Sequence, residues 1–175
     1  MRNIDPKDFV VRINDIWKNK WFLLTSGDFN LSHFNTMTVA WGYFGIMWNR
    51  PMAVVVVRPV RHTFKFIEQY SSFTLSAFGK KHQRDLLLLG TRSGRDGNKL
   101  ENTGLTACAA AVVEAPAFEE AELVVECRKV YWDDFKPEHF LDEKIDRNYP
   151  KKDYHRMYFG EILRISGSES YRVPG

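Results

Sequence analysis

The chain has 175 residues, of which 44% are apolar and 27% are charged, and its formal net charge at pH 7 is +3. This length suits one domain with a single core that buries roughly 70% of the unfolded chain's surface. So small a net charge does not indicate nucleic-acid binding, and no apolar run is long enough to cross a bilayer. We therefore expect a globular protein that binds neither nucleic acid nor membrane.

The cysteines and the first residues bear on the compartment. Cys108 and Cys127 lie far apart and lack Cys-x-x-Cys spacing, so both are expected to be reduced and to pack as small apolar side chains. The first residues lack the apolar stretch of a secretory signal. Together these features predict a cytoplasmic protein.

A short helix and then a strand are expected at the N-terminus. Asp5-Pro6 is typical of a helix cap followed by proline at the first helical position. Ile16 and Trp17 then share a helical face, and Trp17 is expected in the core. The range 21–25 is the first predicted strand, and Ser26-Gly27-Asp28 is the turn that closes it.

The next two strands carry the features that point to a ligand. Polar and apolar residues alternate over 36–41, which predicts a strand whose threonines, Thr36 and Thr38, lie on one face. That face is the candidate ligand side. The β-branched range 53–57 predicts the following strand, and Arg58 stands where it ends.

A helix is predicted just after Pro59, because apolar residues recur at helical spacing from Phe64 onward. Its first turn then lies near Arg61 and Thr63. Backbone amides at a helix N-terminus carry partial positive charge, and an arginine and a hydroxyl beside them make this end a candidate phosphate site. The alternative is that Thr63 merely caps the helix.

The remaining elements follow from alternation and from breaker residues. A tetraleucine helix is expected around 86–89, and the polar loop 91–99 follows it. Alanine makes 105–113 ambiguous, and its valines together with the flanking Gly104 and Pro116 favour a strand. Further strands are predicted over 73–78, 123–131 and 157–165, with an irregular segment over 137–149.

Three strings in this order resemble a known family. They are Asn35-Thr36-Met37-Thr38 followed by Trp41-Gly42, then Trp48-Asn49-Arg50-Pro51, then Arg58-Pro59-Val60-Arg61-His62-Thr63. With the segment 154–162 they resemble the flavin reductase-like proteins of the FMN-binding split-barrel superfamily, in particular the flavoredoxin branch. The resemblance implies a mainly β fold with flanking helices, a six-stranded antiparallel Greek-key barrel, as a single domain over 1–175 with its core at about 21–165.

The resemblance also implies FMN as cofactor, bound at a homodimer interface. In this hypothesis the Asn-Thr-Met-Thr edge contacts the isoalloxazine and ribityl, the arginines and Thr63 hold the phosphate, and an aromatic residue covers the ring. The candidate cofactor-binding residues are Asn35, Thr36, Met37, Thr38, Trp41, Arg58, Arg61, Thr63, Phe78, Lys99 and His155. Arg95 is a weaker candidate beside Lys99.

The expected activity is NAD(P)H-dependent reduction of the flavin, with no catalytic side chain and no metal. FMN supplies the redox chemistry, and the scattered histidines lack metal-ligand spacing. NADH and NADPH are equally open, since the G-x-G-x-x-G turn of a Rossmann unit is absent.

The sequence leaves three alternatives to a flavin reductase. One is an FMN electron carrier that does not itself oxidise NAD(P)H. Another is a pyridoxamine-phosphate-oxidase-like protein, which the Asn-Thr-Met-Thr and Arg-Pro-x-Arg-x-Thr strings fit poorly. The last is a structural domain that takes up no flavin.

Overall fold

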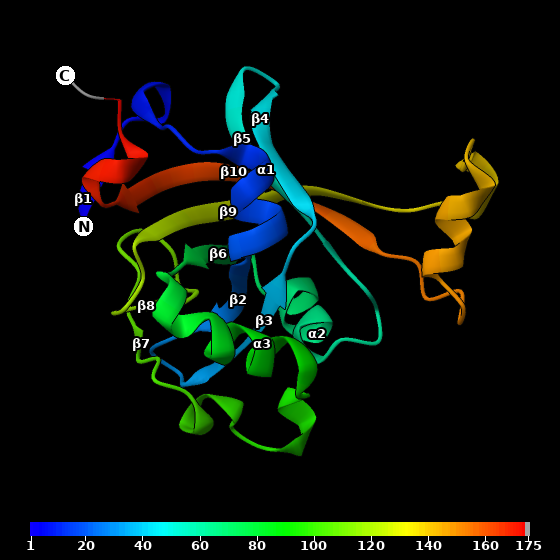
Figure 1. Cartoon of the computed structure of the whole chain (residues 1–175), viewed down its shortest axis with the longest axis horizontal. Helices are drawn as coiled ribbons and strands as arrows, with labels where there is room; N and C mark the ends of the chain where they lie inside the picture. Colours follow the sequence, from blue (N-terminus) through cyan, green and yellow to red (C-terminus); the bar gives the residue numbers. More distant parts are fainter. Residues whose placement is uncertain (174–175) are drawn as a thin grey trace.

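The computed structural model describes residues 1–173 and is built around one antiparallel sheet (Figure 1). The strands run in the order β3-β2-β6-β9-β10-β5-β4, and β1 pairs with β10. Their bounds are Arg2–Ile4 (β1), Phe22–Asp28 (β2), His33–Val39 (β3), Gly42–Met47 (β4), Arg50–Val57 (β5), Ser72–Ala77 (β6), Leu123–Asp134 (β9) and Arg156–Gly167 (β10). The predicted mainly β antiparallel fold is confirmed, with eight strands in this sheet instead of six.

The sheet curls around one core. Alternate residues of seven strands enter it, as the two-residue period of a strand requires, for example Phe22 and Leu24 of β2 and Val55 and Val57 of β5. Trp17, from the short helical segment before β2, packs into the same core as predicted. Because inner residues of nearly all strands meet each other, the sheet has the curvature of a barrel.

Three α-helices and several 3-10 turns lie outside the sheet. The α-helices are Ile13–Asp15 (α1), His62–Gln69 (α2) and Gln83–Thr91 (α3). α1 continues into a π-helical stretch, and α3 covers the outer side of β2 and β9 with Leu86 and Leu89 buried beneath it. No helix in the part of the chain that the structure describes is long and apolar enough to cross a membrane.

Three parts of the fold differ from the sequence-based expectation. Ser26-Gly27-Asp28 was expected to be a turn, but these three residues are the last of β2 and pair with β3. The range 105–113 was expected to be a strand, but only Ala107–Cys108 (β7) is extended there, paired with Ala117–Phe118 (β8). β4 was not expected, and it pairs with β5 through a two-residue turn at Trp48 and Asn49. Both turn residues have positive φ, 52° and 56°, which is the geometry that suits a tight hairpin.

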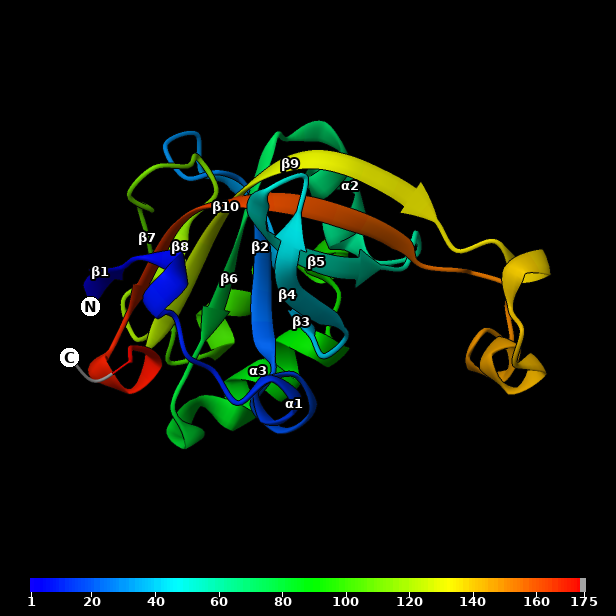
Figure 2. The same ribbon diagram turned by 90° about the horizontal axis from the view of Figure 1, so that it is seen from above.

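The segment 135–155 extends from the ends of β9 and β10 as an arm. Figures 1 and 2 both show it reaching away from the body of the molecule. It contains two 3-10 turns, Pro137–His139 and Glu143–Asn148, and Phe140 stacks on Tyr149 inside it. The arm begins and ends beside the site described next.

Candidate functional site

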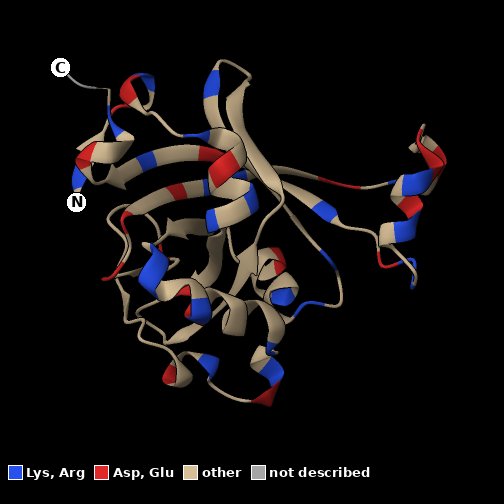
Figure 3. Cartoon of the chain, in the orientation of Figure 1, with Lys and Arg blue, Asp and Glu red and all other residues tan. Residues whose placement is uncertain are grey.

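A cavity of about 200 Å³ lies where β3, the start of α2 and the loop after α3 meet. Four of its lining residues are cations, and none is an aspartate or glutamate. Figure 3 shows basic positions in the connection from β5 to α2 and in the loop that follows α3. We name it the cation cavity; its lining side chains include Asn35, Met37, Arg61, Thr63, Arg92, Ser93, Arg95 and Lys99. Such a lining suits an anion.

The first turn of α2 forms one wall of this cavity. Arg61 precedes the helix in an extended conformation, and no side chain of the described residues caps the helix there. The amide of Asn35 donates a hydrogen bond of 2.7 Å to the hydroxyl of Thr63, which is fully buried. This bond ties β3 to α2. The helix end therefore presents its amides and the Thr63 hydroxyl beside an arginine.

The cations are held by backbone carbonyls. Arg61 donates to the oxygen of Gly90 at 2.6 Å, and Arg95 donates to that of Val60 at 3.1 Å. The ammonium of Lys99 donates to the carbonyl of Leu89 at 2.9 Å. Carbonyls orient these groups without neutralising their charge, so the positive charge of the cavity is left available to a ligand.

The pKa values of these residues reflect the same excess of positive charge. Burial, and then the nearby Arg61, lower the pKa of Lys99 to about 8. Burial and the charge of Arg58 likewise lower the pKa of Arg61. The pKa of His62 is lowered by burial and by the neighbouring charges of Arg95, Lys65 and Lys99. A bound anion would stabilise all of these charged forms.

Gly94 allows the loop after α3 to approach β3. A Cβ atom at this position would lie 2.3 Å from the amide oxygen of Asn35 and 3.0 Å from a ring carbon of His62. Real Cβ atoms do not come so close to other atoms. Only glycine therefore fits here with the loop in its present position.

A second cavity, of about 180 Å³, lies further along β3. It is lined by the range 37–41, Val56, Arg58 and His155, and we name it the Trp41 cavity. The rings of Trp41 and His155 lie 5.1 Å apart, and 47% of Trp41 is exposed. This end offers a flat, partly open aromatic surface.

His155 is held at the base of the arm. Its Nδ1 lies 2.8 Å from the hydroxyl of Tyr149. Burial, with a smaller contribution from Arg58, lowers the pKa of His155 to about 4, although Asp153 acts in the opposite direction. The imidazole is therefore neutral at pH 7.

Arg58 lies at the Trp41 cavity and not at the cation cavity. It donates to the carbonyl of Asn148 at 2.7 Å, pairs with Asp153 at 3.3 Å and lies over the ring of Tyr149. The sequence placed Arg58 with Arg61 and Thr63 on a phosphate. In the structure Arg58 instead joins the arm to the end of β5, and it acts on Arg61 only through its charge.

The threonine side chains of β3 are more buried in the protein interior than was expected. The hydroxyl of Thr36 is buried, with Thr25 donating to it at 2.9 Å, and Thr38 donates to the carbonyl of Leu86. Met37 is 7% exposed and belongs to the core. The side chains of Thr36, Met37 and Thr38 are therefore largely used by the fold.

Phe78 lies apart from the other candidates. It is 4% exposed, packs edge-on against Phe118 and borders a different cavity with Gly79 and Gln83. The structure thus brings the other candidate residues except Thr36 to two adjoining cavities along β3, and it leaves Phe78 and Thr36 outside them. Trp41 is the accessible aromatic side chain.

The lining residues that were not candidates from the sequence include His62, Arg92 and Gly94. Arg92 and Gly94 belong to a loop whose apolar residues do not recur at a regular spacing. Only the composition of this loop could therefore indicate a role in binding. The glycine and the basic residues on either side of it were the one usable signal.

Comparison with known proteins decides the family. The family model described as the flavin reductase like domain matches residues 20–171. The chain belongs to the flavin reductase-like domain family. An uncharacterized protein of Pyrococcus abyssi is 28% identical over 120 residues, which are 67% of this chain and 58% of that protein. The match thus spans little more than half the length of this relative.

Solved structures share the fold of this flavin reductase-like chain. Flavoredoxin from Methanosarcina acetivorans has a TM-score of 0.67 and 22% identity, with 88% of this chain and 71% of that chain covered. An FMN-binding protein from Thermus thermophilus, solved with p-hydroxybenzaldehyde, has a TM-score of 0.67 and 16% identity, with 97% and 83% covered. At these identities the likeness supports the split-barrel fold.

Proposed function

We propose that this protein binds FMN and acts as an NAD(P)H-dependent flavin reductase. The observation that carries the proposal is the arrangement of a cavity rich in cations and an aromatic cavity along one strand, from Asn35 to Trp41. Six steps of extended chain span about 20 Å. A ligand with an anionic end and a flat end fits this arrangement.

The cation cavity would hold the phosphate. Amides at the start of α2, the Thr63 hydroxyl and the guanidinium of Arg61 are donors of the kind that phosphates accept, and Lys99 and Arg95 add charge. Met37 borders both cavities, so the ribityl chain would pass along its backbone. Lys99 is buried, so its charge acts on the cation cavity without its side chain blocking the opening of that cavity.

The Trp41 cavity would hold the ring. Bound FMN would supply the hydride acceptor, its N5 atom, while the chain binds and orients it. Trp41 offers a stacking surface, and neutral His155 contributes a polar edge beside it. The base of the arm keeps Arg58 beside this end, where it can stabilise negative charge on a reduced ring.

The cofactor assignment is tested with purified protein and FMN. We expect flavin fluorescence to be quenched on binding and, without oxygen, the flavin absorbance to bleach on addition of NADH or NADPH. Protein that neither carries nor takes up flavin would contradict the proposal.

The second candidate function is an FMN electron carrier with no NAD(P)H oxidation of its own. The similarity to the flavoredoxin structure favours it. The two candidates separate in the same anaerobic experiment. Protein-bound FMN that dithionite reduces, but that neither NADH nor NADPH bleaches, would identify the carrier.

We also infer a homodimer. The outer face of β4, β5, β9 and β10 carries an apolar patch in which Tyr43, Trp48 and Tyr131 are about half exposed, with Val54 and Phe159 buried in the same face. Tyr131 and Phe159 lie 5.3 Å apart, and Trp48 packs edge-on against Tyr131. A patch of this kind marks a protein interface.

The patch continues to Val56, which lines the Trp41 cavity. A second subunit seated on the patch would therefore cover the ring end of the flavin.

We infer in addition that the protein works in a reducing compartment, the cytoplasm, because Cys108 and Cys127 are both free thiols.

A further inference from the structure

Tyr149 brings the arm back to the edge of the Trp41 cavity. It follows the second 3-10 turn of the arm, Glu143–Asn148, and only 1% of it is exposed. Its ring stacks on Phe140, with the centroids 6.2 Å apart, and the guanidinium of Arg58 lies 5.1 Å from its centroid. Its hydroxyl lies 2.8 Å from Nδ1 of His155. These contacts fix where the hydroxyl lies relative to the imidazole.

The burial of Tyr149 decides which of the two groups donates this hydrogen bond. A tyrosine hydroxyl has one proton, and a neutral imidazole has one N–H and one bare nitrogen. If Nδ1 of His155 carried the proton, the buried hydroxyl would have no acceptor among the described residues, which is costly for a buried donor. If the hydroxyl donates to Nδ1, both groups are paired. The proton of the imidazole then lies on Nε2.

The Nε2 atom of His155 is the one left for a ligand. His155 lines the Trp41 cavity. Among the described residues none forms a hydrogen bond with Nε2, and this atom is not buried. Burial and the charge of Arg58 keep the imidazole neutral at pH 7, against the smaller effect of Asp153. The cavity is therefore offered one neutral N–H donor.

We propose that Tyr149 is a positioning residue that holds the proton of His155 on Nε2, so that the imidazole presents a neutral N–H donor to the ring bound in the Trp41 cavity. A donor at this place recognises a hydrogen-bond acceptor, such as a ring carbonyl or an unprotonated ring nitrogen. This inference rests on the proposed flavin site, and it gives the arm a part in that site.

The donor should favour the reduced form of the bound ring. A hydrogen bond to a charged acceptor is roughly twice as strong as one to a neutral acceptor. Reduction adds negative charge to the ring, so a fixed Nε2–H stabilises reduced FMN more than oxidised FMN. With the proton on Nδ1, the bare Nε2 would instead repel that charge. Because Tyr149 does not line the Trp41 cavity, it acts on the ring through His155.

The first test locates the proton in flavin-free protein. Nitrogen NMR shifts of isotope-labelled histidine distinguish a ring nitrogen that carries a proton from one that does not, and we expect the Nε2–H form of His155 in wild-type protein. Tyr149→Phe removes one hydrogen bond and keeps the ring, so the ratio of the Nε2–H to the Nδ1–H form should fall about 2- to 10-fold. Tyr154→Phe removes another hydroxyl of the arm, which donates to Asp146 at 2.8 Å, and should leave the ratio unchanged.

The second test measures the affinities for oxidised FMN and for FMN reduced with dithionite. In Tyr149→Phe the affinity for reduced FMN should fall, relative to that for oxidised FMN, by about the same 2- to 10-fold factor. Tyr154→Phe is again the control. In a His155→Ala background Tyr149→Phe should have no further effect, because the imidazole through which it acts is absent. A purely structural role of Tyr149 would instead weaken both forms of FMN alike.

Agreement of both tests supports the proposal. A wild-type imidazole protonated on Nδ1, or a tautomer ratio that Tyr149→Phe leaves unchanged, would overturn it. So would a changed tautomer ratio without a changed preference for reduced FMN, because His155 would then form no hydrogen bond with the ring. If neither form of FMN binds, the proposed function fails, and the first test, which needs no flavin, still decides whether Tyr149 fixes the tautomer.

Discussion

At the scale of single residues, the site depends on a few cations that the fold holds without neutralising. Arg61 was predicted because an arginine beside a helix start has a physical reason to bind phosphate. Arg92 and Gly94 could not be predicted, since they act through the path of a loop that has no repeating pattern. Thr36 was predicted to face the ligand, yet its hydroxyl has an internal partner that only the register of β2 and β3 reveals.

Arg61→Ala should weaken FMN binding about 10- to 100-fold, the equivalent of one charge-assisted hydrogen bond of roughly 1.5 to 3 kcal/mol. The fold should stay intact, because the guanidinium contacts only the carbonyl of Gly90 among the described residues. Fluorescence titration with FMN measures the effect. Lys81→Ala, which removes an exposed charge elsewhere, is the matched control. Equal affinities for wild type and Arg61→Ala would exclude Arg61 from the site.

FMN affinity should fall as the pH rises above 8. In the free protein the pKa of Lys99 is lowered to about 8, so the ammonium loses its proton there. A bound phosphate favours the charged form and raises this pKa, so binding above pH 8 requires uptake of a proton. Titrations between pH 7 and 9.5 measure the change, and Lys99→Met should flatten it. A fall of the same slope in Lys99→Met would assign the effect to another group.

At the scale of elements, the amphipathic pattern was a good guide to α2 and to the long strands, and a poor one where the chain has few apolar residues in alternation. β4 was missed because its glycines and aromatic residues break the period of two. The range 105–113 was ambiguous because alanine favours neither state, and long-range packing left most of it irregular. Tertiary contacts decided both cases.

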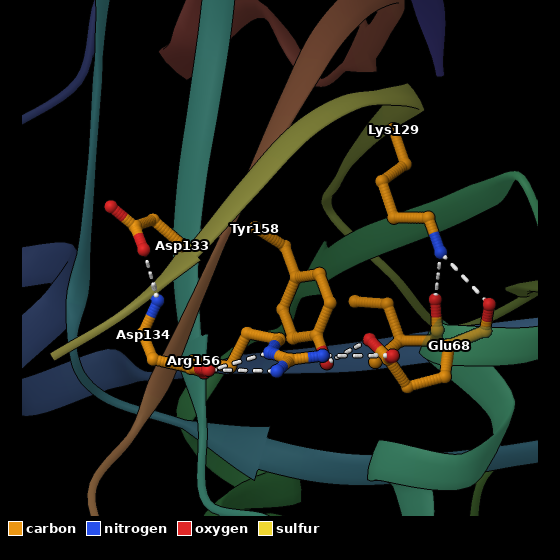
Figure 4. Close-up of polar contacts among 7 residues, drawn as sticks. Glu68, Lys129, Asp133, Asp134, Arg156 and Tyr158 are labelled. Carbon is orange, nitrogen blue, oxygen red and sulfur yellow. Dashed lines mark hydrogen bonds and ion pairs between the residues drawn. The ribbon is translucent and has the colours of Figure 1, made fainter.

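Helix α2 is clamped at its C-terminal end by a network from β9 and β10 (Figure 4). Arg156 forms two hydrogen bonds of 2.7 Å to Asp134 and a third of 2.9 Å to Glu68 of the helix. Tyr158 donates to the same glutamate at 2.6 Å. Lys129 donates to two carbonyls of the last turn, a favourable place for a cation. The network fixes the helix whose other end lines the cation cavity.

Arg156→Leu should lower the free energy of unfolding by about 1 to 3 kcal/mol, because it leaves two carboxylates without their partner. Hydrogen bonds from Arg156 lower the pKa of Asp134 below its ordinary value of 3.8. Their contribution is therefore present above pH 3.8 and is lost as the pH falls below it. Urea unfolding at pH 7 and pH 3 measures both effects.

The control for this variant is Arg128→Leu, which removes a more exposed arginine that pairs with Glu161. Exposed ion pairs contribute roughly 0 to 1 kcal/mol, so this variant should unfold almost as the wild type does. Equal losses in the two variants would show that the clamp has no special part in stability.

At the scale of the whole molecule, the mainly β class and the positions of most strands could be predicted, but the order in which the strands pair could not. Alternation identifies inner and outer faces strand by strand, while pairing of β6 with β9 and of β5 with β10 depends on residues more than 40 positions apart. The arm was expected only as an irregular segment. Its direction, away from the body, follows from the length of β9 and β10 (Figure 2).

The apolar patch predicts that Tyr131→Lys will dissociate the homodimer. An ammonium at the centre of an apolar interface loses its hydration without gaining a partner. Light scattering after size-exclusion chromatography should give twice the monomer mass for wild type and the monomer mass for the variant. Leu87→Lys, at an exposed apolar position on α3, should stay dimeric. Wild-type protein that elutes as a monomer would contradict the interface.

The uncapped first turn of α2 has one more consequence. In most helices a serine, threonine, aspartate or asparagine accepts a hydrogen bond from this turn, and its loss costs roughly 1 kcal/mol. Here that stabilisation is left for an incoming anion to supply, so the start of the helix should fray in the empty protein and become ordered when the site is filled. Amide protons of His62 and Thr63 would then exchange with deuterium much more slowly in the loaded form, and secondary structure itself would report occupancy.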